Sequence, residues 1–354
     1  MIAGDRAAAR KTPGRAARRG TRGRRARGRS VILAAALYVV GAAAPAAADM
    51  APSSLPVSGG EPLVPVPAAA PADPGLVALG RALFFDTRLS ADGTASCATC
   101  HDPRLGGSDG RPVAVGTDGV PRLFNTPTLF NAGFAARFGW RGDQSTLEDA
   151  VADAVPAELG GEWSAVIDRL SADADMAAAF PGGVSKRGME RALAAYVRAL
   201  TTPDAPFDRW LAGESEALTD SQKRGYALFK AYGCAGCHQG RAAGGTMFQP
   251  IGLFKPFFPR HGTNPRADLG RYAVTGREAD RHSFKVPTLR NVAQTAPYLH
   301  DGSVATLSGV VRVMAYYQVG RSPTDREVAD IVAFLESLTA PVPPLALPPG
   351  EAPS

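Results

Sequence analysis

Two copies of a five-residue motif, C-x-x-C-H, constrain this 354-residue chain more than any other feature of its sequence. The copies span residues 97–101 and 234–238 and use all four cysteines of the chain. Two thiols at this spacing can form thioether bonds to the two vinyl groups of one haem, and the histidine that follows can ligate its iron. The sequence therefore predicts two covalently attached haem c groups, held by Cys97, Cys100, His101, Cys234, Cys237 and His238.

Two other uses of four cysteines compete with this interpretation. The cysteines could form two disulfides, or they could supply the four ligands of one zinc site. A histidine follows each pair at once, which favours haem over both alternatives. If both haems are attached, no thiol remains for a disulfide.

The first 48 residues have the pattern of a cleaved export signal. Residues 1–30 contain eleven basic residues and one acidic residue, and an apolar run at 31–44 leads into small residues that fit an A-x-A cleavage site. The run is short for a membrane span, so we expect cleavage, export to the periplasm and no stable span afterwards, with an uncleaved anchor as the alternative. The remaining chain has 28 basic and 32 acidic residues, so its charge gives no support for binding to nucleic acid.

The rest of the chain contains an internal repeat. Residues 127–151 align without gaps on residues 287–311 at an offset of 160, and each haem motif follows a similar G-x-A-L-F segment. We therefore predict a duplicated unit, with one haem in each copy. The predicted divisions are a signal at 1–48, a Pro/Ala-rich linker at 49–75, haem domains at 76–203 and 204–340, and a Pro-rich tail at 341–354. We expect the linker and the tail to be extended or mobile.

The segments between these divisions are mostly predicted to be helical. Apolar residues recur at helical intervals within 184–200, and capping boxes begin at Thr219 and at Thr324. Long connections rich in glycine and proline, such as 240–264, join the helices. The sequence thus predicts a mostly α fold with long loops.

Several spaced motifs resemble those of the bacterial di-haem cytochrome c peroxidases and their MauG-like relatives. The resemblance covers roughly residues 76–340. It implies two cytochrome c-like haem domains, of which the N-terminal one is peroxidatic and the C-terminal one transfers electrons. The motifs are F-F-D-T-R-L-S at 84–90, N-T-P-T-L-F-N-A at 125–132, F-K-V-P-T-L-R-N at 284–291 and A-P-Y-L-H-D-G at 296–302.

The resemblance also implies a distal ligand for the C-terminal haem. Met314 occupies the position of the family's distal methionine, and a thioether ligand favours a high reduction potential. MauG-like proteins have tyrosine there, so Tyr316 and Tyr317 are alternatives, and a core methionine is the alternative to any ligand. At the offset of 160, Met314 aligns with Ala154, whose side chain cannot bind iron.

The N-terminal haem is predicted to have an open distal side. Peroxidases of this family that need prior reduction have a histidine where this sequence has Thr117, and no histidine occurs between His101 and His238. The resemblance implies that a glutamate assists cleavage of peroxide, and Glu158 matches it, with Glu148 and Glu162 as alternatives. A solvated glutamate at a helix end is the structural alternative.

Four further residues match positions with roles in this family. Trp140 matches the tryptophan that lies between the haems, and the alternative is a packing residue. The resemblance implies that oxygen atoms of Asn125, Thr295 and Pro297 bind one calcium ion, a hard cation that carbonyl oxygens can ligate.

The resemblance thus implies a periplasmic peroxidase that reduces hydrogen peroxide, without prior reductive activation. Its electrons would come from a small c-type cytochrome or a cupredoxin. One alternative is a MauG-like oxidase of a partner protein's aromatic residues, and another is a di-haem electron carrier without catalytic activity. A homodimer is left open.

Overall fold

The computed structural model describes residues 60–351 except 70–71 and 262–263. The chain separates into two units, 1–50 and 51–354, and the described residues all belong to the second. The predicted signal at 1–48 and much of the predicted linker lie outside the described residues. None of the described helices is long and apolar enough to cross a membrane.

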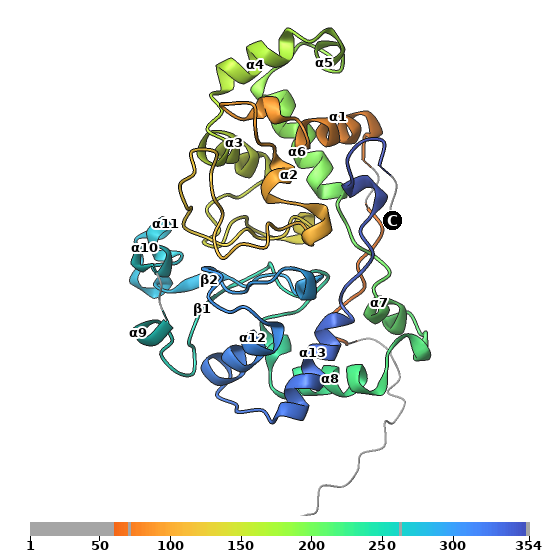
Figure 1. Ribbon diagram of the computed structural model, residues 1–354. Helices are drawn as coiled ribbons and strands as arrows, with labels where there is room; N and C mark the ends of the chain where they lie inside the picture. Colours follow the sequence, from red (N-terminus) through yellow and green to blue (C-terminus); the bar gives the residue numbers. More distant parts are fainter. Residues whose placement is uncertain (1–59, 70–71, 262–263, 352–354) are drawn as a thin grey trace, which may run out of the picture. The chain divides into compact units, whose positions relative to one another are not determined.

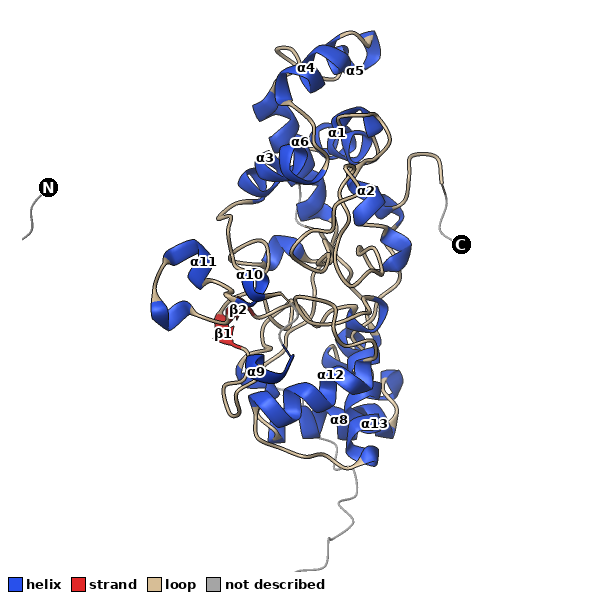
Figure 2. Cartoon of the chain, turned by 60° about the vertical axis from the view of Figure 1, so that its left-hand side comes forward, coloured by secondary structure: helices blue, strands red, loops and turns tan. Residues whose placement is uncertain are grey.

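The described chain consists mainly of helices and loops (Figure 2). This confirms the predicted fold class. Its α-helices are α1 (Pro74–Phe84), α2 (Cys97–Cys100), α3 (Leu147–Glu158), α4 (Trp163–Ser171), α5 (Ala174–Ala178), α6 (Lys186–Ala199), α7 (Pro206–Leu211), α8 (Asp220–Ala231), α9 (Phe258–His261), α10 (Pro265–Asp268), α11 (Tyr272–Thr275), α12 (Leu307–Val313) and α13 (Asp325–Glu336). A π-helix, Met314–Gln318, continues α12 directly.

The chain has an N-terminal half and a C-terminal half, which correspond to the predicted haem domains at 76–203 and 204–340. Each half contains two helices that cross closely. In the N-terminal half α1 packs against α6 (Figure 1), and in the C-terminal half α8 packs against α13. A Cβ atom at Gly80 of α1 would overlap the carbonyl oxygen of Ala192, and one at Gly225 of α8 would overlap that of Asp330. Glycine at these two repeat-equivalent positions therefore permits the close approach of the helices in both halves.

Both predicted capping boxes are present. Thr219 accepts a hydrogen bond from the backbone N–H of Gln222 at 3.3 Å, and the Gln222 side chain accepts one from the Thr219 N–H at 2.8 Å. Thr324 and Glu327 make the same reciprocal pair at 3.3 and 2.8 Å. These bonds satisfy free amides at the first turns of α8 and α13, the two helices of the C-terminal core.

One short sheet lies within a region expected to be loop. Strand β1 (Phe248–Pro250) pairs antiparallel with β2 (Ser283–Lys285), and Phe248 is opposite Lys285. Three-residue strands contain too few residues to show an alternating pattern, so they could not be predicted from the sequence. The segment 240–264 also contains α9, so it is more ordered than the long connection that we expected.

The described ends of the chain pack against its folded halves. Leu63, at the N-terminal end, is fully buried in the core of the C-terminal half. Ala346, at the C-terminal end, is fully buried in the core of the N-terminal half, and the Arg81 guanidinium of α1 donates to the Leu347 carbonyl at 2.7 and 2.9 Å. Each end therefore packs on the opposite half. These contacts depend on a few apolar residues that lie among prolines. Such residues form no periodic pattern, so the packing could not be predicted from the sequence.

A buried ion pair fixes the N-terminal segment around residues 63–66 to the C-terminal half. Arg290 is fully buried, and its guanidinium lies 2.7 Å from a carboxylate oxygen of Asp208 on α7. The same guanidinium donates to the carbonyl oxygens of Val64 and Arg241, both at 2.9 Å. Asp208 in turn lies 3.4 Å from the backbone N–H of Val66. One charged pair thus joins four segments that are distant in sequence, around residues 64–66, 208, 241 and 290.

The halves also share one buried hydroxyl. Asn131 and Asn291 are equivalent residues of the repeat, and both have left-handed backbone, with φ of 61° and 60°. Their side-chain amides both donate to the Thr202 hydroxyl, at 2.7 and 2.9 Å. The Thr202 N–H donates to the Asn131 side chain at 3.0 Å, so the polar groups at this buried junction satisfy one another.

Removal of the Asp208 carboxylate should strongly destabilise the protein. Asp208→Ala leaves the Arg290 charge buried without its partner, so we expect the free energy of unfolding to fall by about 3–5 kcal/mol. Urea titration of the haem-loaded protein measures this loss. The control is Glu214→Ala, which breaks the exposed pair of Glu214 with Arg209 and should cost no more than about 1 kcal/mol. Equal losses in the two variants would contradict the role of the buried pair.

Candidate functional site

The two motif histidines are held in the same way. The Nδ1 atom of His101 lies 3.1 Å from the Gly107 carbonyl oxygen, and that of His238 lies 3.2 Å from the carbonyl oxygen of Ala243. A carbonyl can only accept, so Nδ1 carries the proton and Nε2 is left with a free lone pair. Burial lowers the pKa of both rings, that of His238 to about 4, which keeps them neutral. Neutral Nε2 is the form in which histidine ligates iron.

The four cysteines are free and lie in two separate pairs. Burial raises the pKa of Cys97 to about 12 and that of Cys234 to about 11, so these thiols are protonated near neutral pH. Within the ranges that the structure covers, no three residues of His, Cys, Asp or Glu gather as a metal-binding group. The two pairs therefore do not form the single four-cysteine zinc site considered from the sequence.

A large cavity adjoins the first motif. It has a volume of about 970 Å³ and is lined by Cys97, Cys100 and His101, mainly among apolar side chains. The residues Ala242, Gly245, Lys285 and Thr288 of the C-terminal half also line it. Two thiols, a neutral imidazole and an apolar wall are the set that a covalently attached haem requires, so the residues present fit that group.

Glu158 reaches this cavity from the end of α3. It is the last residue of the helix and belongs to the cavity lining. Carboxylates are unfavourable at the C-terminal end of a helix dipole, and Arg122 offsets this cost, since its Nε donates to Glu158 at 3.1 Å. Arg122 also pairs with Asp118 at 3.1 Å. A charged network thus holds the only glutamate among the described residues that line the cavity.

The end of α3 is shaped by a proline. Pro156 lies within the helix and cannot donate a hydrogen bond to the carbonyl oxygen of Ala152. The indole N–H of Trp163 donates to that oxygen instead, at 3.3 Å. This side-chain bond compensates for the missing backbone bond and ties α4 to the turn that carries Glu158.

The alternative glutamates lie elsewhere. Both carboxylate oxygens of Glu148 accept from the Arg198 guanidinium, at 2.8 and 2.6 Å, and Glu162 lies at the N-cap of α4. Neither is among the described residues that line the cavity. The structure therefore brings only Glu158 of the three candidates to the site.

Thr117 lies beside the end of α3. Its hydroxyl donates to the Leu159 carbonyl at 3.3 Å, and Leu159 directly follows Glu158. The loop that carries Thr117 is closed by backbone bonds, of which the Gly116 N–H to the Val120 carbonyl, at 3.1 Å, is one. Thr117, which stands where some peroxidases of the family have a histidine, thus holds its loop against α3.

The distal helices of the two halves match in register. Helix α3 spans 147–158, and α12 with its π-helix spans 307–318, which is the same range at the offset of 160. Ala154, which lines the N-terminal cavity, is therefore equivalent to Met314, the first residue of the π-helix. Insertions of π-helix are frequent at functional sites.

The repeat also pairs Glu158 with Gln318. The Gln318 amide bridges backbone groups, since it donates to the Pro250 carbonyl at 3.0 Å and accepts from the Gly252 N–H at 3.0 Å. The same position therefore carries a structural amide in one half and a carboxylate that lines a cavity in the other.

The two tyrosines near Met314 have other partners. The Tyr317 hydroxyl lies 2.7 Å from Nε2 of His261. Tyr316 is exposed, and the Lys255 ammonium lies 3.6 Å from the centre of its ring. These contacts favour Met314 over either phenol as the ligand, although the ligand itself stays a prediction.

Trp140 lies at a symmetric contact between the halves. Its repeat equivalent is His300, and the two ring centroids are 6.5 Å apart. The Lys285 N–H donates to the Trp140 carbonyl at 2.9 Å, and the Asn125 N–H donates to the His300 carbonyl at 2.8 Å. Since Asn125 and Lys285 are also equivalent, one bond is the repeat image of the other. Trp140 is therefore positioned where the two halves meet.

The predicted calcium ligands are engaged in protein contacts. The Asn125 carbonyl accepts from the Trp140 indole N–H at 2.8 Å, and the Thr295 hydroxyl donates to the Val292 carbonyl at 3.2 Å. Pro297 follows a cis peptide bond and is partly exposed. A carbonyl oxygen has a second lone pair, so these contacts leave room for an ion. The calcium site stays a prediction.

The sequence assigned no role to two residues of the cavity, Arg122 and Lys285. Arg122 pairs with the candidate acid, and Lys285 enters the cavity from the other half. Neither belongs to a haem motif, and Arg122 gives no periodic or spacing signal. The repeat does give a signal for Lys285, because it aligns this lysine with a neutral residue, Asn125.

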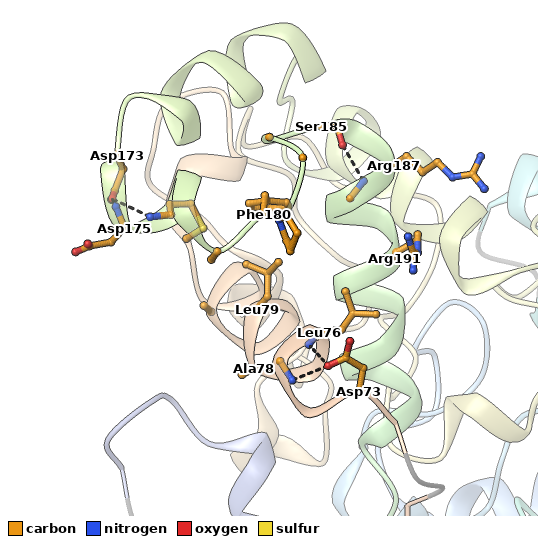
Figure 3. Close-up of a pocket in the computed structure, with 18 residues that line it drawn as sticks. Asp73, Leu76, Ala78, Leu79, Asp173, Asp175, Phe180, Ser185, Arg187 and Arg191 are labelled. Carbon is orange, nitrogen blue, oxygen red and sulfur yellow. Dashed lines mark hydrogen bonds between the residues drawn. The ribbon is translucent and has the colours of Figure 1, made fainter.

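A second cavity lies between α1, α5 and α6 and has a volume of about 940 Å³ (Figure 3). Leu79 and Phe180 form part of its apolar wall, and Arg187 and Arg191 lie along the α6 side. None of the described residues that line it belongs to a haem motif. The first cavity is therefore the candidate site.

Comparison with known families agrees with this geometry. A family model described as di-haem cytochrome c peroxidase matches residues 74–216, and a cytochrome c model matches residues 222–339. Each match contains one of the two C-x-x-C-H motifs.

Individual relatives are similar over most of the chain. Cytochrome c peroxidase Ccp of Escherichia coli (strain K12) is 45% identical over 78% of this chain, which spans 61% of that protein's length. Cytochrome c551 peroxidase of Nitrosomonas europaea is 38% identical over 81% of this chain and 87% of the relative. Among solved structures, a MauG-like protein associated with microbial copper homeostasis has a TM-score of 0.69 and 30% identity, with 81% of this chain and 95% of that chain covered.

Proposed function

The chain belongs to the di-haem cytochrome c peroxidase family, and we propose that it reduces hydrogen peroxide to water at the N-terminal of its two covalent haem c groups. Two electrons and two protons convert one peroxide molecule into two water molecules. One observation carries the proposal. The described lining of the cavity beside His101 contains a glutamate but no second histidine and no methionine.

The haem, His101 and Glu158 have different roles in the proposed reaction. When bound, each haem supplies an iron that takes up and passes on electrons, and an iron with an open position binds a small oxidant. His101 would bind the iron through Nε2, because its Nδ1 donates to the Gly107 carbonyl. The Glu158 carboxylate accepts a proton from one peroxide oxygen and returns it to the other, which leaves as water.

Arg122 serves this proton transfer by its contact with Glu158. The guanidinium is charged at all relevant pH values, and its hydrogen bond at 3.1 Å holds the carboxylate in place at the cavity. Thr117 keeps the adjoining loop on α3 and offers no imidazole to the iron. We therefore propose that the N-terminal haem reacts without prior reduction of the other haem.

The C-terminal haem relays the electrons in this proposal. His238 is its proximal ligand, and Met314 is the proposed distal ligand. Trp140 lies where the halves meet, and it is the proposed aromatic residue between the haems. The proposed electron donor is a small c-type cytochrome or a cupredoxin, and the proposed location is the periplasm. Calcium binding and a homodimer remain predictions.

A MauG-like oxidase is the second candidate function. Thr117 in place of a gating histidine supports it, as does the similarity to a MauG-like protein of known structure. The contacts of Tyr316 and Tyr317 with Lys255 and His261 argue for methionine ligation, which supports the peroxidase instead. A di-haem carrier would need a strong distal ligand at both irons, which the described lining of the N-terminal cavity does not provide.

Loss of the Glu158 carboxylate should impair peroxide turnover. Glu158→Gln keeps the shape of the side chain but cannot accept the proton, so we expect kcat/KM for peroxide to fall by about 10²- to 10⁴-fold. Stopped-flow kinetics with a reduced small c-type cytochrome measure this. Glu148→Gln is the control, since Glu148 binds Arg198 outside the cavity, and its activity should be near that of the unmodified protein. An undiminished rate in Glu158→Gln would remove the proposed role.

Replacement of Met314 should alter one haem only. Met314→Leu removes the thioether that stabilises the ferrous state, so the reduction potential of the C-terminal haem should fall, and the reduced haem should gain carbon monoxide binding. Spectroelectrochemistry and carbon monoxide difference spectra measure the two effects. Tyr316→Phe, the control, should leave both properties unchanged. If the tyrosine variant alone changes them, Met314 is not the ligand.

A further inference from the structure

Lys285 carries a positive charge from the C-terminal half into the N-terminal cavity. It is the last residue of β2, and its side chain lines the cavity that contains His101. No hydrogen bond or ion pair of its ammonium group is found within the described residues. By contrast, the other two cations of the lining have acidic partners: Arg122 pairs with Glu158, and Arg141 pairs with Asp143 at 2.5 Å.

The backbone fixes where this side chain lies. The Lys285 N–H donates to the Trp140 carbonyl at 2.9 Å, and Lys285 pairs with Phe248 across the sheet. Phe284 and Val286, its neighbours, are both buried in the C-terminal half. Since successive side chains of a strand point to opposite faces, Lys285 points away from that interior and towards the N-terminal half.

An ammonium group in this position needs an anion. Desolvation lowers the pKa of Lys285 to about 8, and no neighbouring carboxylate opposes this effect. The carboxylates that line the cavity are already used: Glu158 and Asp143 by arginines, and Asp153 by the side-chain amide of Gln144 at 3.1 Å. The missing partner must therefore come with the group that fills the cavity. A haem brings two propionate carboxylates.

We propose that Lys285 binds a propionate of the N-terminal haem, so that the C-terminal half contributes a charged contact to the haem of the other half. This inference rests on the attachment of a haem at Cys97 and Cys100. The repeat supports it, because the equivalent residue Asn125 uses its side-chain amide on the Arg111 carbonyl at 2.8 Å and brings no charge. The C-terminal half thus offers a charged contact to the N-terminal haem, and the equivalent residue of the N-terminal half offers none in return.

Such a contact has a defined redox effect. Ferric haem carries one more positive charge than ferrous haem, so a nearby ammonium disfavours the ferric state. Lys285 therefore raises the reduction potential of the N-terminal haem and ties that haem to the half that delivers electrons. It acts as a positioning residue and takes no part in proton transfer.

The experiment compares Lys285→Met and Lys285→Arg in the haem-loaded protein. We expect the methionine variant to lower the reduction potential of the N-terminal haem, leave that of the C-terminal haem in place and shift the propionate bending band in resonance Raman spectra. The arginine variant should restore both properties, since it keeps the charge. Lys223→Met, which removes a lysine of α8 outside the cavity lining, is the control and should change neither.

The outcomes separate this inference from the proposed enzyme activity. The potentials and the Raman spectra are recorded without peroxide, so a protein that fails to turn over peroxide can still show the predicted shifts. An unchanged potential and an unchanged propionate band in Lys285→Met would overturn the inference. A shift confined to the C-terminal haem would also overturn it. If Lys285→Met fails to retain haem, Lys285→Gln, compared with Lys285→Arg, provides the same test.

Discussion

A single buried hydroxyl, that of Thr202, joins the two haem-binding halves. It accepts hydrogen bonds from Asn131 and Asn291, the same residue of the two repeats, and both of these asparagines require left-handed backbone. Because the hydrogen bonds leave little freedom, the two halves meet in one register. That register brings Trp140 against His300 and places Lys285 of one half in the haem cavity of the other.

Duplication has given the protein one helix with two uses. Helix α3 and the α12–π-helix pair begin and end at equivalent residues. They differ at two positions for which we propose roles at the haems, 154/314 and 158/318. Ala154 and Glu158 line the N-terminal cavity, where the proposed mechanism needs room for an oxidant and a base. Methionine and glutamine at 314 and 318 supply a proposed iron ligand and a structural bridge. We propose that the differences at these two positions separate the reaction with peroxide from the relay of electrons.

Much of this could be predicted from the sequence, because the decisive features are local. The haem motifs, the capping boxes at Thr219 and Thr324 and the repeat all depend on residues close together in the chain or aligned by duplication. The role of Glu158 was inferred from the family resemblance and stays a prediction, although Glu158 lines the cavity. Features that depend on contacts between distant segments could not be predicted. The packing of Leu63 and Ala346 on opposite halves, and the pairing of Arg122 with Glu158, arise only once the chain has folded.

We propose that the N-terminal iron has an open distal side, while the C-terminal iron has two protein ligands. Low-temperature EPR spectroscopy of the fully oxidised protein tests this most directly, because coordination by two strong ligands gives low-spin ferric haem. We expect one high-spin signal from the N-terminal haem and one low-spin signal from the C-terminal haem. Two low-spin signals without a high-spin component would contradict this proposal.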